Sequence, residues 1–184
     1  MGYPKLFRVA ALLILLAGPV VGSASASECV GHIKLPAAQG GSYDVCDGSG
    51  KPMLLAFLHV VPDRADTPSR SQAVFLSSMY EQYGARGLEV LAVETTASSR
   101  RQLVNAVYEW QLAFPLLEDE RSQAKKAFEV TVVPSSFLLD PDGKVLERWD
   151  GLASSAALAR AIEVLLGGPL GRLPRASPFP YRTP

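Results

Sequence analysis

Hydrophobic residues fall into short runs and helical faces from residue 50 onward. Met53 to Val61 is apolar apart from His59, and Leu88 to Val93 is a second largely apolar run. Runs of this length between turn residues predict strands that are covered on both faces. Between the two runs, apolar residues recur with helical spacing at Phe75, Leu76, Met79, Tyr80 and Tyr83. We therefore expect a strand, a helix and a second strand in this order.

The pattern continues with a second helix and a short third helix. Ser98 or Ser99 can cap the second helix, whose apolar face is Leu103, Val104, Val107, Tyr108 and Trp110. Residues 114–117 are expected to form only a short extended link. Ser122 opens the third helix, which is expected to end near Phe128.

A hairpin and a last helix complete the pattern. Strands are expected at Ser135–Leu139 and Lys144–Trp149, joined by the turn sequence Asp-Pro-Asp-Gly. Ser154 or Ser155 begins a final helix that places Leu158, Ile162, Leu165 and Leu166 inward. Strands joined by helices are parallel and the late hairpin is antiparallel, so the pattern predicts an α/β fold with a central mixed sheet flanked by helices.

The two ends of the chain differ from this periodic part, which we assign to one domain, residues 51–167. Residues 27–50 are an irregular lead with weak strand signals at 32–35 and 43–45. Residues 168–184 contain five prolines and no apolar periodicity. Such a composition predicts a disordered tail outside the fold.

The first 26 residues have the pattern of a secretory signal peptide. Lys5 and Arg8 precede an apolar stretch, Val9 to Val21, and Ala24-Ser25-Ala26 fits a cleavage site for small residues. The stretch is short for a membrane span and contains Gly and Pro. We expect cleavage after Ala26, export to the periplasm or the extracellular space, and no stable membrane insertion afterwards.

Charge excludes some classes of partner. The chain has 18 basic and 18 acidic side chains, and both charged residues of the leader are basic. This balance gives no electrostatic basis for binding nucleic acid or an anionic membrane surface.

The chain has two cysteines, Cys29 and Cys46. In an oxidising compartment an isolated even pair favours one structural disulfide. The alternative is a redox-active pair, but the spacing is long and neither cysteine opens an amphipathic helix.

Four segments resemble the thioredoxin superfamily, and most of all its exported TlpA/ResA-like and AhpC/TSA redoxin branch. They are residues 50–57, which resemble the first core strand, and 83–91, which resemble the helix-to-strand step. Residues 127–140 resemble the segment around the cis-proline of the family, and 142–145 close the hairpin. The order and spacing of these segments carry the resemblance, which implies the thioredoxin-like fold and its peptide groove.

The reactive cysteines of this family are missing at the matching place. The family has Cys-x-x-Cys at the start of the helix after the first core strand, where the helix N-terminus stabilises a thiolate. Counting back from Tyr83 places Asp66, Thr67, Pro68 and Ser69 on those four positions. A serine there cannot replace the thiolate without an activating base. Capping of the following helix by Asp66 or Thr67 is the simpler role.

Pro134 matches the cis-proline of the family, which lies across the groove from that helix start. The resemblance implies that the backbone of Val133 is free to pair with an extended peptide as an added strand. His59, at the end of the first core strand, is expected to line the same groove.

These observations lead to one preferred function and several alternatives. We prefer a redox-inactive domain that binds a peptide or an exported protein, as a chaperone or assembly factor would. The alternatives are a thiol-disulfide oxidoreductase or a peroxiredoxin-like protein that uses Cys29 and Cys46. A hydrolase with Ser69, His59 and Asp66 or Glu94 is disfavoured because no Gly-x-Ser-x-Gly elbow is present. No cofactor is expected, and no metal site, since the only histidines are His32 and His59.

Overall fold

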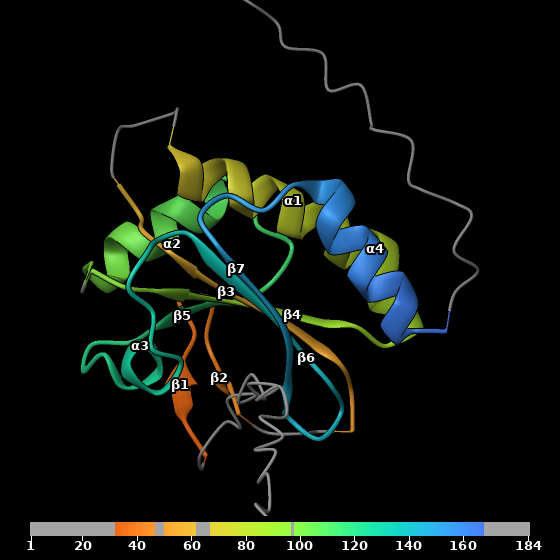
Figure 1. The fold of residues 1–184 in the computed structure, drawn as a ribbon. Helices are drawn as coiled ribbons and strands as arrows, with labels where there is room; N and C mark the ends of the chain where they lie inside the picture. The colour runs from red at the N-terminus through yellow and green to blue at the C-terminus, as the bar shows by residue number, and fades with distance from the viewer. Residues whose placement is uncertain (1–31, 47–49, 62–66, 97, 168–184) are drawn as a thin grey trace, which may run out of the picture.

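A five-stranded mixed sheet forms the centre of the protein (Figure 1), with strand order β5-β4-β3-β6-β7. The computed structural model describes residues 32–46, 50–61, 67–96 and 98–167. The strands of this sheet are β3 (Met53–Leu58), β4 (Glu89–Glu94), β5 (Leu116–Glu118), β6 (Ser135–Leu139) and β7 (Val145–Asp150). The helices are α1 (Pro68–Tyr83), the 3₁₀ turn η1 (Gly84–Arg86), α2 (Arg100–Glu109), α3 (Gln123–Ala127) and α4 (Ser155–Leu165).

The sheet changes direction at its central strand. β3 pairs in parallel with β4, with Met53 opposite Glu89, and β4 pairs in parallel with β5. On its other side β3 pairs antiparallel with β6, with Phe57 opposite Ser135, and β6 pairs antiparallel with β7. The carboxyl end of β3 therefore lies beside the start of β6, which is how the fold brings residues near 59 and 134 to one end of the sheet.

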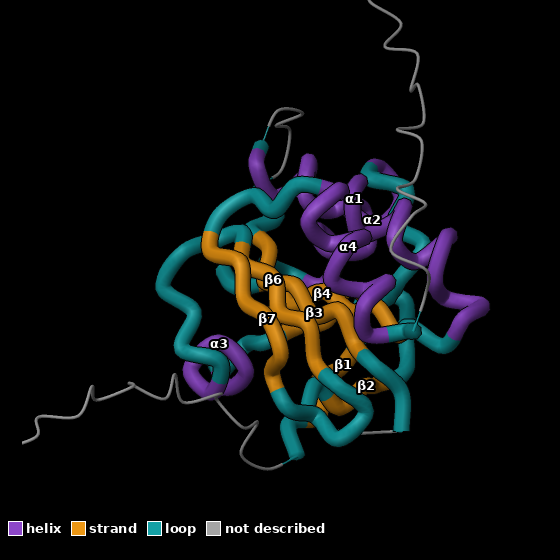
Figure 2. Tube along the Cα trace, turned by 45° about the vertical axis from the view of Figure 1, so that its right-hand side comes forward, coloured by secondary structure: helices purple, strands orange, loops and turns teal. Residues whose placement is uncertain are grey.

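Helices α1, α2 and α4 cover one face of the sheet (Figure 2). β3 contributes Leu54, Ala56 and Leu58 to the core beneath them. The helices contribute buried apolar residues with the expected spacing: Ala73, Leu76, Met79, Leu103, Ala106, Leu158 and Ile162. Both faces of β3 are fully buried, which explains its uninterrupted apolar sequence.

The opposite face is covered by α3 and by a small hairpin of β1 (Lys34–Pro36) and β2 (Ser42–Asp44). Three rings fill the space under the sheet, because Phe57, Phe128 and Phe137 lie with centroids 5.1 to 5.6 Å apart. The hairpin is anchored where the Ala38 N–H donates to the Leu116 carbonyl at 2.8 Å. It lies at the opposite end of the molecule from the start of α1 in both views (Figures 1 and 2).

The structure confirms the predicted α/β class and corrects three details. The strand expected over Met53–Val61 ends at Leu58, after which His59 is exposed. Residues 114–117 were expected to form only a short extended link, and the structure shows that Leu116–Glu118 is the strand β5, which pairs with β4. The lead expected to be irregular contains the β1–β2 hairpin.

Several predictions concern residues outside the described part of the chain. These are the signal peptide, Cys29 and hence the Cys29–Cys46 disulfide, Asp66, and the tail from residue 168. Among the described residues, no helix is long and apolar enough to cross a bilayer.

Candidate functional site

The start of α1 is a capped helix terminus. Thr67 is the N-cap, and its Oγ1 accepts a hydrogen bond from the Arg70 N–H at 3.1 Å. Pro68 occupies the first helical turn, where the missing N–H costs nothing. Of the two capping candidates, Thr67 is confirmed, and Asp66 lies outside the described residues.

The side chain of Ser69 has a structural role at the start of α1 and is not exposed to solvent. Its side chain is buried, with 3% of the residue exposed. Its Oγ accepts a hydrogen bond from the His59 backbone N–H at 3.0 Å. The hydroxyl thus ties the first turn of α1 to the chain just after β3, so the fourth position of the degenerate motif serves packing and local hydrogen bonding.

The Val133–Pro134 peptide bond is cis, and the loop around it is held from two sides. The Pro134 carbonyl accepts from the Gly151 N–H at 2.8 Å. The Ser135 hydroxyl donates to the Val132 carbonyl at 2.6 Å and lies 3.0 Å from Asp150 Oδ1. The start of β6 and the end of β7 together fix the position of Pro134.

The backbone of Val133 makes no hydrogen bond within the described part of the chain. Val132, its neighbour in the chain, is 46% exposed, and Leu152, which follows the Gly151 that bonds to Pro134, is 50% exposed. An unpaired backbone donor and acceptor between apolar side chains is the arrangement that receives an extended peptide as an added strand.

A chain of hydrogen bonds links this loop to α1. Gly151 bonds to Pro134 as described, and two residues later the Ala153 N–H donates to Gln72 Oε1 at 2.8 Å. Gln72 is fully buried and lies one turn beyond Ser69. The sequence analysis missed Gln72 and the loop at 151–153, because nothing in their local pattern indicates a contact 81 residues apart in the sequence.

Asp150 and Arg148 form the polar border of the loop. The Arg148 guanidinium donates to Asp150 Oδ1 at 3.0 Å, and it lies 5.2 Å from the centroid of the Phe137 ring. The hydrogen bond from Arg148 holds the pKa of Asp150 below its usual range, with a smaller contribution from Ser135. The lowered pKa favours the carboxylate form of Asp150, which accepts the hydrogen bond from Ser135 next to Pro134.

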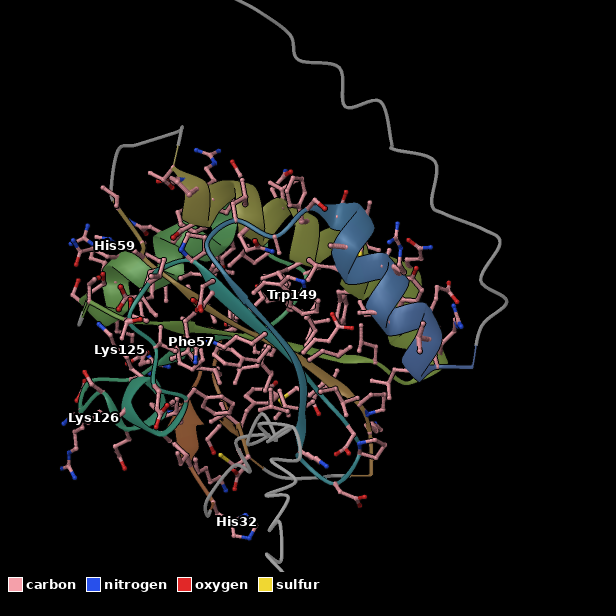
Figure 3. The ribbon with its side chains drawn as sticks, in the orientation of Figure 1. His32, Phe57, His59, Lys125, Lys126 and Trp149 are labelled. Carbon is pink, nitrogen blue, oxygen red and sulfur yellow. The ribbon has the colours of Figure 1, made fainter. Side chains whose placement is uncertain are left out.

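Among the described residues, Ser69, His59 and Glu94 do not form the disfavoured Ser–His–acid arrangement, and Asp66 lies outside the described part of the chain. His59 reaches Ser69 through its backbone N–H, so the imidazole is not the partner of the hydroxyl. The buried Glu94 carboxylate accepts instead from the backbone N–H groups of Thr96 and Ser98, at 2.9 and 3.2 Å. Figure 3 shows His59 at the outer end of β3 and His32 at the far end of the molecule. Among the described residues, no group of three or more His, Cys, Asp or Glu side chains could hold a metal ion.

Cys46 lies away from the start of α1. It follows β2, packs against the core under the sheet, and its N–H donates to Asp44 Oδ1 at 3.0 Å. The structure therefore brings Ser69, the backbone of His59 and Val133–Pro134 to the end of the sheet where β3 ends and β6 begins. Cys46 follows β2, in the hairpin that lies at the opposite end of the molecule from the start of α1 (Figure 1).

Sequence comparison gives a family and a set of relatives. The AhpC/TSA family matches residues 27–148. The thiol-disulfide oxidoreductase ResA of Bacillus thuringiensis subsp. konkukian is 29% identical over 84 residues, covering 46% of this chain and 48% of the relative. ResA of Bacillus subtilis is 25% identical over 91 residues, which is 50% of each chain. The chain thus matches about half the length of these relatives.

Solved structures show the same fold. A Chlorobium tepidum protein assigned as thiol:disulfide interchange protein DsbE superposes with a TM-score of 0.67 and 25% identity, covering 77% of this chain and 97% of the other. The bacterioferritin comigratory protein of Xanthomonas campestris superposes with a TM-score of 0.57 and 20% identity, covering 73% and 90%. Both superpositions support the thioredoxin-like fold that the resemblance implies.

Proposed function

The chain belongs to the AhpC/TSA family, and from this premise we propose that it is an exported, redox-inactive member that binds an extended segment of a partner protein. Binding takes place along Val133, beside Pro134. The sequence relatives are named thiol-disulfide oxidoreductases. We propose that this chain shares their fold but does not carry out their thiol chemistry.

The unpaired backbone of Val133 carries the proposal. A backbone N–H and C=O without partners in the described structure are costly unless water or a ligand satisfies them. A peptide strand satisfies both at once, while Val132 and Leu152 cover its apolar side chains. The hydrogen bonds from Gly151 and Ser135 hold the loop in place before binding, which lowers the entropy lost on association.

The absence of a thiol at the helix start supports the redox-inactive part. Cys29 and Cys46 are the two cysteines of the sequence. The four positions that align with the Cys-x-x-Cys of the family hold Asp66, Thr67, Pro68 and Ser69 instead. A thiolate elsewhere would lack the helix N-terminus that lowers a thiol pKa in this fold. Thiol-disulfide exchange or peroxide reduction by Cys29 and Cys46 is the competing function, favoured by the names of the relatives.

Export is the remaining part of the proposal. It rests on the basic, apolar and small-residue segments of the first 26 residues. Expression of the full chain with N-terminal sequencing of the product tests it, and we expect the purified protein to begin at Ser27. A product that retains Met1 and stays in the cytoplasm would contradict export.

Peptide binding is tested by titrating the ¹⁵N-labelled protein with the blocked pentapeptide Ac-Ala-Val-Thr-Val-Ala-NH₂ and following amide chemical shifts. We expect the largest shifts at Val133 and Ser135. The double variant Val132→Asp/Leu152→Asp should weaken binding at least about fivefold, because it removes apolar contacts that contribute about 1 kcal/mol or more to the free energy of binding.

Val164→Asp is the matched control, since Val164 is an exposed apolar residue on α4 and lies outside the loop. It should bind the pentapeptide as the unsubstituted protein does. Shifts confined to other parts of the protein, or equal binding by the double variant, would contradict the proposed groove.

A further inference from the structure

A small cavity lies between α2 and the segment that follows β3. Val60 and Val61 line it from the β3 side, and the residues from α2 and its cap include Asn105, Ala106, Glu109 and Trp110. Its volume is about 180 Å³. Pockets that take whole small molecules start at roughly 300 Å³, so this cavity has room for a single side chain.

The cavity has an apolar floor and a polar rim. Residues three or four apart in a helix share one face, so Asn105 and Ala106 lie one turn before Glu109 and Trp110. Val60 and Ala106 are each 3% exposed and Trp110 is 6% exposed, and these residues form the floor. Asn105 and Glu109 are exposed and form the rim, where a ligand has access from solvent.

The rim has an unpaired negative charge. Glu109 is the one charged residue in the wall of this cavity, and its carboxylate forms no ion pair or hydrogen bond in the described structure. The Asn105 amide also has no hydrogen-bond partner there. Gln102, another wall residue, differs because its Oε1 accepts from the Ser99 N–H at 2.9 Å. The Glu109 carboxylate and the Asn105 amide oxygen are therefore the acceptors that the rim offers to a ligand.

The position of Glu109 in α2 also favours a cation. Glu109 is the last residue of the helix, and the last turn contains no basic residue. The carbonyl groups at a helix C-terminus carry a partial negative charge, so a carboxylate is unfavourable there and a cation is favourable. The two basic residues of α2, Arg100 and Arg101, stand in its first turn. A cation bound at the rim would interact with both the carboxylate and the end of the helix.

The cavity lies close to the groove at Pro134. β3 and β6 pair with Phe57 opposite Ser135. The next position of this register sets Leu58 opposite Pro134, and Val61 follows Leu58 by three residues. Neighbouring strands are about 5 Å apart and a strand advances about 3.3 Å per residue, so an extended peptide spans the distance from Pro134 to Val61 with about four residues.

We propose that the cavity takes a lysine or arginine side chain of the partner segment, about four residues from the residue that pairs with Val133. The apolar stem of this side chain lies on the floor, and its charged head reaches Glu109 and Asn105 at the rim. The inference rests on the proposed binding at Val133. It adds a chemical requirement for the partner, which is an extended segment with a basic residue at this spacing.

The experiment is a titration of the ¹⁵N-labelled protein with the blocked nonapeptide Ac-Lys-Ala-Ala-Val-Thr-Val-Ala-Ala-Lys-NH₂, which presents a lysine in either strand direction. Two matched peptides replace both lysines with norleucine, which keeps the stem without the charge, or with glutamate. We expect all three peptides to shift the Val133 amide. The lysine peptide should also shift the Asn105 side-chain amide and the Trp110 indole N–H, whose signal Trp149→Phe identifies because the chain has two tryptophans. The norleucine and glutamate peptides should bind at least about threefold more weakly, the effect of one exposed ion pair.

A variant at the rim separates the cavity from the groove. Glu109→Gln should weaken binding of the lysine peptide about threefold, remove its advantage over the norleucine peptide, and leave binding of Ac-Ala-Val-Thr-Val-Ala-NH₂ unchanged. Its thermal midpoint should not fall, because the carboxylate stands at the unfavourable end of α2. Glu81→Gln is the matched control, since Glu81 is an exposed carboxylate on α1 outside the cavity, and it should bind the lysine peptide as the unsubstituted protein does.

The failure of the cavity and the failure of the groove give different results. Shifts at Val133 without shifts at Trp110 and Asn105, or equal affinity for the lysine, norleucine and glutamate peptides, would overturn the inference and leave the proposed groove standing. No shift at Val133 with any of the peptides would contradict the groove, and the inference with it.

Discussion

At the start of α1, individual side chains serve local structure at the positions where redox relatives carry reactive thiols. Thr67 caps the helix, Pro68 fits its first turn, and Ser69 accepts from the His59 N–H. Each of these polar atoms already has a structural partner. These contacts fix the start of the helix, and in our proposal recognition falls to the backbone of Val133.

The cap supplies the first prediction. Thr67→Ala removes the oxygen that accepts from the Arg70 N–H, and it should lower the free energy of unfolding by about 1 kcal/mol. Ser71→Ala is the matched control in the same helix, because Ser71 is exposed and its hydroxyl makes no hydrogen bond in the described structure. Urea denaturation measures both variants. A Thr67→Ala protein as stable as the Ser71→Ala protein would show that another group caps α1.

At the scale of elements, α1, η1 and α4 are joined by one polar cluster. Arg86 donates two hydrogen bonds to the Glu163 carboxylate, at 2.8 and 3.1 Å, and lies over the Tyr83 ring. Burial, followed by the nearby negative charge of Glu163, raises the pKa of Tyr83 to about 12. The fold therefore favours the neutral phenol at this position.

This pKa predicts a loss of stability in alkali. In the unfolded chain the phenol loses its proton near the ordinary value of about 10, and in the folded protein it does so only near 12. The contribution of Tyr83 is fully present below pH 10 and is lost as the pH rises through 12. Urea denaturation between pH 9 and 12 should show that Tyr83→Phe lacks this component of the decline.

Tyr108→Phe is the control for the alkaline series, because Tyr108 is 77% exposed. It should follow the unsubstituted protein at every pH. If Tyr83→Phe and Tyr108→Phe change the pH dependence equally, the raised pKa of Tyr83 is not coupled to folding.

The elements also show what a sequence can predict. Apolar periodicity and capping residues predict the buried strands β3 and β4 and the helices α1, α2 and α4. The structure has these elements within a few residues of the expected limits. β5 was predicted only as a short extended link, because three residues are too few for a periodic signal, and its strand character comes from pairing with β4. For the same reason β1 and β2 gave only weak strand signals, and their pairing as a hairpin was not predicted.

The candidate site likewise contains some features that the sequence predicts and others that it does not. Thr67 as a cap and Pro134 at the start of β6 could be placed by local sequence and resemblance. The hydrogen bond from Ala153 to Gln72 and the exposure of Leu152 could not, because they arise when β7 and α1 meet in the tertiary structure. Long-range contacts of loops leave no period in the sequence.

At the scale of the whole molecule, the chain after α4 is expected to lie outside the fold. Residues 168–184 hold five prolines and no apolar periodicity. Truncation after Gly167 should leave the thermal midpoint within about 2 °C of the full protein, since little apolar area is lost. A drop of many degrees in differential scanning calorimetry would mean that the tail packs on the domain.

The central claim is that this thioredoxin-like domain has kept a binding groove without redox catalysis. The reduction of insulin disulfides by the purified protein, with dithiothreitol as the reductant, tests it most directly. We predict a rate at background for the unsubstituted protein and for Cys29→Ser/Cys46→Ser, and a measurable rate for Asp66→Cys/Ser69→Cys, which restores thiols at the helix N-terminus. Robust activity of the unsubstituted protein that disappears in Cys29→Ser/Cys46→Ser would contradict the account.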